Sequence, residues 1–187
     1  MPLKGESPEK EIANYLLRGK AVITPTDTVY GILAIDENLI LQIKKRVHSN
    51  KKTVRLINSI SQIENSVPQD LSNLLNKYWP GALTVIFKGK GYRMPNSQTL
   101  LNAIKIINFP IYASSANITQ NPTVQSLKEA KEIFKNSDIS IEYIDISEGL
   151  KPSQKASTVF NYDTKEILRE GEIKYSDISE YVNLTQE

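Results

Sequence analysis

Apolar residues recur along the chain with the spacing of helices in some stretches and of strands in others. Between Ser7 and Gly19, Ile12 and Leu16 share one helical face behind a serine and a proline that suit a helix start. The same spacing predicts helices over residues 39–47, 71–78 and 100–107, one opening with a capping box at 126–129, and a short one over 176–182.

Short apolar runs between these helices predict strands. They lie at residues 21–23, 32–34, 53–58, 82–87, 110–113 and 141–146, followed by a hairpin of 158–160 and 166–168. Because helices and strands alternate, the pattern predicts an α/β fold, and the terminal hairpin makes its sheet mixed. The chain has no internal repeat or linker, so we expect a single domain over residues 1–187.

Composition narrows the chemistry. The absence of cysteine excludes thiol nucleophiles and cysteine-ligated metals, and the one histidine, His48, excludes a histidine cluster. With 23 basic and 21 acidic residues the net charge is +2, which is too small for a surface devoted to nucleic acid, so any basic site must be local. No run approaches the roughly 18 apolar residues of a membrane span, so we expect a cytoplasmic protein without membrane contact.

Two polar clusters lie in the first third of the chain, next to predicted strands. Residues 25–31 (Pro-Thr-Asp-Thr-Val-Tyr-Gly) are rich in hydroxyls that suit a ligand, although they also suit a turn that bonds its own backbone. Six cations and no acid lie between Lys44 and Arg55. They suit a polyphosphate or an RNA backbone, while the cations in the last turn of the predicted 39–47 helix also suit a solvated helix end.

Two further clusters lie in the second half. Residues 114–117 (Ser-Ser-Ala-Asn) follow a strand and offer small side chains and donors to an anion, or a simple serine or asparagine turn. Ser157 and Thr158 begin one hairpin strand, and Arg169 follows the other. Neither a P-loop nor a dinucleotide fingerprint is present, so a bound nucleotide would be held in another way.

Seven motifs stand in the order found in one known family, and together they span nearly the whole chain. The chain resembles the YrdC/Sua5 family, the threonylcarbamoyl-AMP synthases, in the single-domain YrdC form, through residues 25–31, Lys44-x-Arg46, Trp79-Pro80-Gly81-Ala82-Leu83-Thr84, Arg93-Met94-Pro95, Ser115-Ala116-Asn117, Ser157-Thr158-Val159 and Leu168-Arg169-Glu170-Gly171.

The resemblance implies a YrdC/RibB-like fold, a twisted mixed sheet with flanking helices around a basic cavity. It also implies the conversion of ATP, L-threonine and bicarbonate into L-threonylcarbamoyladenylate and pyrophosphate. The product would pass to a downstream tRNA-modifying transferase complex that modifies adenosine 37 of tRNA. Mg2+ would accompany ATP, held by phosphates and water, and no residue is expected to ligate a metal.

The resemblance also assigns roles to residues. Lys44, Arg46, Ser115 and Asn117 would be catalytic, neutralising and orienting the phosphates. L-Threonine would be bound by Thr26, by Arg93 at its carboxylate, by the Ala113 carbonyl and by Ser157. ATP would be contacted by Lys44, Ser115, Thr123 and Arg169. We expect Lys44 and Arg46 to be partly exposed, so that the fold survives their replacement.

The chain departs from the family pattern in four places. Val47 replaces a proline, Lys51-Lys52 stand where Pro-Leu is usual, and Arg55 stands where the family often has histidine or an apolar residue. The segment 87–93 is also shorter than usual. Two alternatives therefore stay open: an RNA-binding or accessory module that contacts double-stranded RNA or tRNA, and a paralogue with another substrate.

Overall fold

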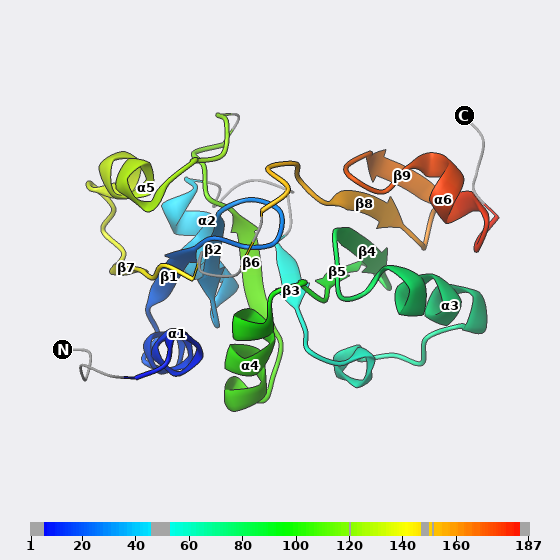
Figure 1. The fold of residues 1–187 in the computed structure, drawn as a ribbon, viewed down its shortest axis with the longest axis horizontal. Helices are drawn as coiled ribbons and strands as arrows, with labels where there is room; N and C mark the ends of the chain where they lie inside the picture. The colour runs from blue at the N-terminus through cyan, green and yellow to red at the C-terminus, as the bar shows by residue number, and fades with distance from the viewer. Residues whose placement is uncertain (1–5, 46–52, 120, 147–149, 151, 184–187) are drawn as a thin grey trace.

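The computed structural model describes residues 6–45, 53–119, 121–146, 150 and 152–183. One nine-stranded sheet runs through this part of the chain in the order β7-β1-β2-β6-β3-β5-β4-β8-β9 (Figure 1). The strands are β1 (Ala21–Thr24), β2 (Gly31–Ala34), β3 (Val54–Leu56), β4 (Leu83–Phe87), β5 (Lys90–Arg93), β6 (Ile111–Ser115), β7 (Ile141–Tyr143), β8 (Thr158–Asn161) and β9 (Glu166–Arg169).

The sheet is mixed, as the sequence predicts. β1 and β7, β3 and β5, and β4 and β8 pair in parallel, whereas the other neighbours are antiparallel. The expected terminal hairpin is the antiparallel pair β8 and β9. The class of α/β fold with flanking helices is therefore confirmed.

Helices cover the sheet in three groups (Figure 1). α1 and α4 pack together over β1, β2, β3 and β6, while α2 and α5 cover the other face of β1 and β2. α3 and α6 pack against β4, β5 and β8. The bounds are α1 (Pro8–Leu17), α2 (Glu37–Ile43), α3 (Gln69–Tyr78), α4 (Gln98–Ile107), α5 (Leu127–Phe134) and α6 (Tyr175–Ser179), with a 3-10 turn η1 (Ile60–Gln62).

Two local predictions were wrong. The helix predicted over 39–47 ends at Ile43, because Lys44 is its C-cap and Lys45 adopts a left-handed φ of 52°. The lysines therefore do not form a helical last turn. Strand β5 was not predicted, since its sequence, Lys-Gly-Tyr-Arg, has neither an apolar run nor an alternation. Its pairing with β3 and β4 holds it in the sheet.

Candidate active site

Strand register brings several predicted site residues to one face of the sheet. Thr84 lies opposite Val159, and Val159 lies opposite Arg169. Because alternate residues of a strand point to opposite faces, Thr84, Arg169 and the preceding Ser157 project from the same side. The Ser157 hydroxyl lies 2.9 Å from that of Thr84, and its oxygen accepts from Arg169 Nη2 at 3.3 Å.

Two arginines share this face. Arg169 lies at the exposed rim and donates from Nε to the backbone oxygen of Ser157 at 3.0 Å. Partial burial of the guanidinium, and then the neighbouring charge of Arg93, lower the pKa of Arg169. The two like charges therefore lie close enough to affect each other, an arrangement that an anion between them would stabilise.

Arg93 is buried and held from three sides. Its Nε donates to the backbone oxygen of Gly81 at 3.0 Å, and its Nη1 donates to Thr28 Oγ1 at 2.8 Å. Its Nη2 lies 2.7 Å from Asp27 Oδ1 in an ion pair. Thr28 in turn lies 3.1 Å from the Thr26 hydroxyl. The hydroxyl-rich loop 25–31 thus bonds within itself and also contacts the arginine predicted to bind threonine.

The predicted phosphate site forms a second group. Lys44 is completely buried, and its Nζ donates to the backbone oxygen of Asn117 at 2.7 Å, to Asn117 Oδ1 at 2.6 Å and to the backbone oxygen of Ser115. Ser115 Oγ also donates to Asn117 Oδ1, at 2.8 Å. Lys44, Ser115 and Asn117 are therefore brought together, whereas Arg46 lies outside the described residues.

The expectation that Lys44 is partly exposed was wrong. The helix α2 ends just before it, and the chain turns at Lys45, so the Lys44 side chain is directed between α2 and the end of β6. An ammonium group with several backbone and amide acceptors is a structural element of its surroundings. In the described conformation Lys44 therefore orders the Ser115–Asn117 segment.

The loop 25–31 connects the two groups. Its last residue, Gly31, pairs with Ser115 across β2 and β6, and Ala116 donates its N–H to the Tyr30 oxygen at 2.7 Å. A Cβ on Gly31 would lie 3.1 Å from the Thr26 methyl, so the glycine permits this close packing.

Two further predicted residues lie beside the Ser115–Asn117 segment. Ala113 lies within β6, between β2 and β3. Half-buried Thr123 precedes Val124, whose N–H donates to the Ala116 oxygen at 2.9 Å.

Arg55 does not belong to this face. It lies opposite Tyr92 on one side and Tyr112 on the other, and its guanidinium carbon is 5.8 Å and 5.6 Å from the centres of their rings. Tyr92 precedes Arg93, and Tyr112 precedes Ala113, so alternation turns Arg55 to the opposite side of the sheet. The departure from the family at Arg55 therefore leaves the Arg93 face unchanged.

Sequence reasoning missed Asp27, Thr28 and Thr84. All three lie inside motifs that the sequence analysis singled out, but nothing in a motif says which side chains meet. The alternation of buried residues along the strand that begins at Leu83 could have predicted that Thr84 lies on the face of Ser157. The Asp27–Arg93 pair could not be predicted in this way, because it joins residues 66 positions apart.

A cavity of about 530 Å3 lies next to the contacts of Arg93 with Asp27 and Gly81. Asp27 and Gly81 line it together with the first turn of α4, Leu150 and Glu172.

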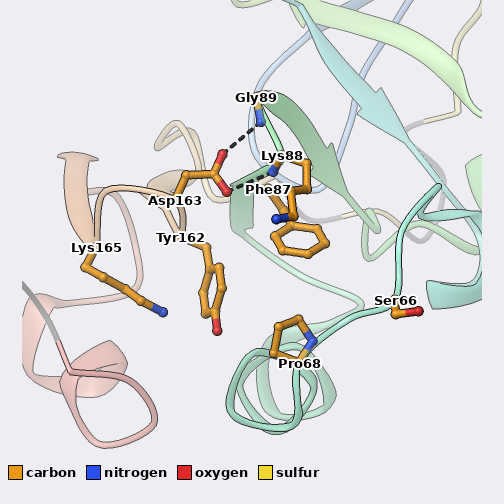
Figure 2. Close-up of a pocket in the computed structure, with 8 residues that line it drawn as sticks. All are labelled: Ser66, Pro68, Phe87, Lys88, Gly89, Tyr162, Asp163 and Lys165. Atoms are coloured by element: carbon orange, nitrogen blue, oxygen red, sulfur yellow. Dashed lines mark hydrogen bonds between the residues drawn. The ribbon is translucent and has the colours of Figure 1, made fainter.

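Another cavity, of about 680 Å3, lies between the N-terminal end of α3 and the turns of the β4–β5 and β8–β9 hairpins, and Figure 2 shows its lining. There Asp163 accepts from the backbone N–H groups of Lys88 and Gly89 at 2.9 and 2.8 Å. In the described part of the chain, none of the predicted site residues lines either cavity. Asp27 of the first cavity pairs with Arg93, however, so we place the candidate site at the Arg93 face beside that cavity.

In the described part of the chain, no helix is long and apolar enough to cross a membrane. Among the same residues, no group of three or more histidine, cysteine, aspartate or glutamate side chains gathers as metal ligands would.

A mixed sheet that gathers two arginines on one face, one of them in contact with a hydroxyl-rich loop, defines an α/β domain with a basic candidate site. The sequence profile of the Sua5/YciO/YrdC family, described as "Telomere recombination", matches residues 14–171. The chain belongs to this family.

The chain is similar to two curated proteins and to a solved structure. It is 32% identical over 171 residues to the "Uncharacterized protein MG259 homolog" of Mycoplasma pneumoniae, covering 90% of this chain and 36% of that one. It is 31% identical over 144 residues to the threonylcarbamoyl-AMP synthase of Pyrococcus abyssi, covering 65% and 42%. The structure of P. abyssi Sua5 complexed with L-threonine matches with a TM-score of 0.77 at 28% identity, over 94% of this chain and 57% of that one. The chain thus spans less than two thirds of each relative.

Proposed function

We propose that the protein is an L-threonylcarbamoyladenylate synthase, a nucleotidyltransferase that uses ATP, L-threonine and bicarbonate. The observation that carries the proposal is that Arg93, which contacts the loop 25–31, and Arg169 share one face of the sheet. Such a face suits a small hydroxylated amino acid next to phosphates, because guanidinium groups bind both carboxylate and phosphate. The similarity to Sua5 complexed with L-threonine supports the same assignment.

The reaction joins a carbamate, made from threonine and bicarbonate, to the AMP part of ATP. Bicarbonate gives CO2 as it loses hydroxide. The threonine amine captures this CO2 as a carbamate and releases one proton, which converts the hydroxide to water. A carbamate oxygen then forms a bond to the α-phosphorus of ATP. The bond from that phosphorus to the bridging oxygen breaks, and pyrophosphate leaves with the electron pair. Positioning and charge neutralisation supply most of the acceleration in such a transfer, so no side-chain nucleophile is needed.

Each residue group has a task in this scheme. Arg93 would bind the threonine carboxylate beside Thr26 and Ser157, and the Ala113 carbonyl would face the amino acid. Arg169 would approach the phosphates from the rim. Mg2+ would arrive with ATP and be held by its phosphates and by water.

Ser115 and Asn117 would orient the phosphates from the other side, with Thr123 nearby. Lys44 would hold their segment in place, since its ammonium group donates to three of the oxygens there. Arg46, which lies outside the described residues, would add charge neutralisation.

The product would serve a downstream tRNA-modifying transferase complex in the cytoplasm. The alternative, direct contact with tRNA or double-stranded RNA, depends on the cations at 46–52. These residues lie outside the described part of the chain, so RNA contact stays a prediction, with affinity that should fall steeply with salt.

The test is a pyrophosphate-release assay with ATP, Mg2+, bicarbonate and L-threonine. Release should require both threonine and bicarbonate. Arg93→Gln should lower kcat/KM for threonine about 10- to 100-fold, because a hydrogen bond to a charged group contributes roughly 1.5–3 kcal/mol.

Arg18→Gln, a change of an exposed arginine at the end of α1, is the matched control and should retain full activity. Melting curves of both variants check that each is folded. Pyrophosphate release without threonine, or no release at all, would refute the proposed function.

A further inference from the structure

Arg93 already has an anionic partner in the described structure. The Asp27 and Arg93 side chains are 10% and 9% exposed, and Asp27 Oδ1 lies 2.7 Å from Arg93 Nη2. Within the described residues, however, neither of these two atoms makes a hydrogen bond of good geometry, although both are buried. Arg93 makes well-formed bonds through Nε and Nη1 instead. The contact with Asp27 is therefore the least directional of the three.

The other oxygen of Asp27 has a partner other than the arginine. Asp27 Oδ2 accepts from the backbone N–H of Asn96 at 3.1 Å, just before the first turn of α4. Asp27 also lines the cavity of about 530 Å3, together with Gln98 and Thr99 of that turn. The free N–H groups at a helix N-terminus favour a carboxylate. Asp27 thus has a polar space beside it into which its carboxylate can move while it keeps the Asn96 bond.

One charge opposes this movement. Glu172 also lines the cavity, and a second carboxylate there would be repelled by it. In the absence of an anionic ligand, the position at Arg93 is therefore the favoured one. The position toward α4 becomes favoured when another carboxylate neutralises Arg93.

We propose that Asp27 is an internal competitor for Arg93, whose carboxylate holds the guanidinium in the empty site and is exchanged for the carboxylate of the incoming amino acid. The proposal rests on the proposed function, in which Arg93 binds that carboxylate. Only a ligand with its own carboxylate can complete the exchange, so the competition with Asp27 affects the binding of the free amino acid and not that of its amide.

The exchange lowers the apparent affinity for threonine. If the competent state, with Arg93 released, is populated in about a tenth of the molecules, the observed Kd is about ten times the intrinsic one. Removal of the Asp27 charge should therefore lower the observed Kd for threonine to its intrinsic value. Asp27→Asn keeps the size of the side chain and an oxygen for the Asn96 N–H.

The experiment is calorimetric titration of the wild type and Asp27→Asn with L-threonine and with L-threonine amide. We expect the variant to bind L-threonine about tenfold more tightly and to gain nothing for the amide. In the pyrophosphate assay the KM for threonine should fall, while the KM for ATP stays unchanged. Asp36→Asn, at the exposed N-cap of α2, is the matched control and should bind as the wild type does.

Two other results would overturn the proposed exchange. If Asp27 merely orients Arg93, Asp27→Asn will bind threonine equally or more weakly, and the exchange is refuted. Asp27→Ser replaces the asparagine variant should that one fail to fold. If Arg93→Gln retains wild-type threonine affinity, or if the wild type binds no threonine, the proposed function fails, and the exchange fails with it.

Discussion

Lys44→Met should destabilise the protein. The sequence suggests otherwise, because Lys44 belongs to a run of cations of the kind usually found on the surface. Methionine matches the length of lysine without its donors, so the backbone oxygens of Ser115 and Asn117 each lose a buried partner, while Asn117 Oδ1 keeps the Ser115 hydroxyl. An unsatisfied buried acceptor costs about 1–3 kcal/mol. Because the variant no longer buries an ammonium group, part of this cost is recovered, and we expect a net loss of about 3 kcal/mol.

Thermal unfolding followed by circular dichroism measures this loss. In a protein of this size 1 kcal/mol shifts Tm by about 2–4 °C, so Lys44→Met should lower Tm by about 6–12 °C. Lys45→Gln changes the exposed neighbouring lysine and should leave Tm within about 1 °C of the wild type. Equal melting temperatures for the two variants would show that the Lys44 hydrogen bonds do not stabilise the fold.

Two further predictions concern the hairpin of β8 and β9. Gly171→Ala should lower the urea midpoint strongly, because the new Cβ would lie 2.2 Å from the Ala156 oxygen, whereas Gly91→Ala, with contacts of 3.6 Å or more, should be tolerated. Burial and then the hydrogen bond to the Asp70 carboxylate raise the pKa of Tyr162 from 10.0 to about 12. The free energy of unfolding should therefore fall as pH rises from about 10 to about 12, and Tyr162→Phe should lose that part of the fall; identical pH profiles would refute the raised pKa.

The elements that could be predicted are those whose pattern is local. α5 begins where Ser126 accepts from the Glu129 N–H, as the capping box at 126–129 predicts. The early end of α2 could not be predicted, because lysine has a good helix propensity. The buried contacts of Lys44 with the end of β6 override that propensity.

The candidate site likewise has a part that the sequence predicts and a part that depends on contacts between distant residues. Motifs indicate that Arg93, Ser157 and Arg169 matter, but their common face follows from strand register, which pairs residues far apart in the chain. The position of Arg55 shows the consequence. It lies in the basic stretch, but Arg55 pairs with Tyr92, the residue before Arg93. Because neighbouring residues of a strand point to opposite faces, Arg55 lies on the face opposite Arg93.

The charges of the described site suggest why an anionic ligand completes it. Arg93 has the carboxylate of Asp27, whereas Arg169 donates to the two neutral oxygens of Ser157. A partly buried guanidinium beside a second one is not neutralised by hydroxyl and carbonyl groups, as the lowered pKa of Arg169 indicates. A phosphate at Arg169 would supply the missing charge, and a carboxylate at Arg93 would release Asp27. Binding of both substrates would thus neutralise two neighbouring arginines to which the described residues contribute one carboxylate.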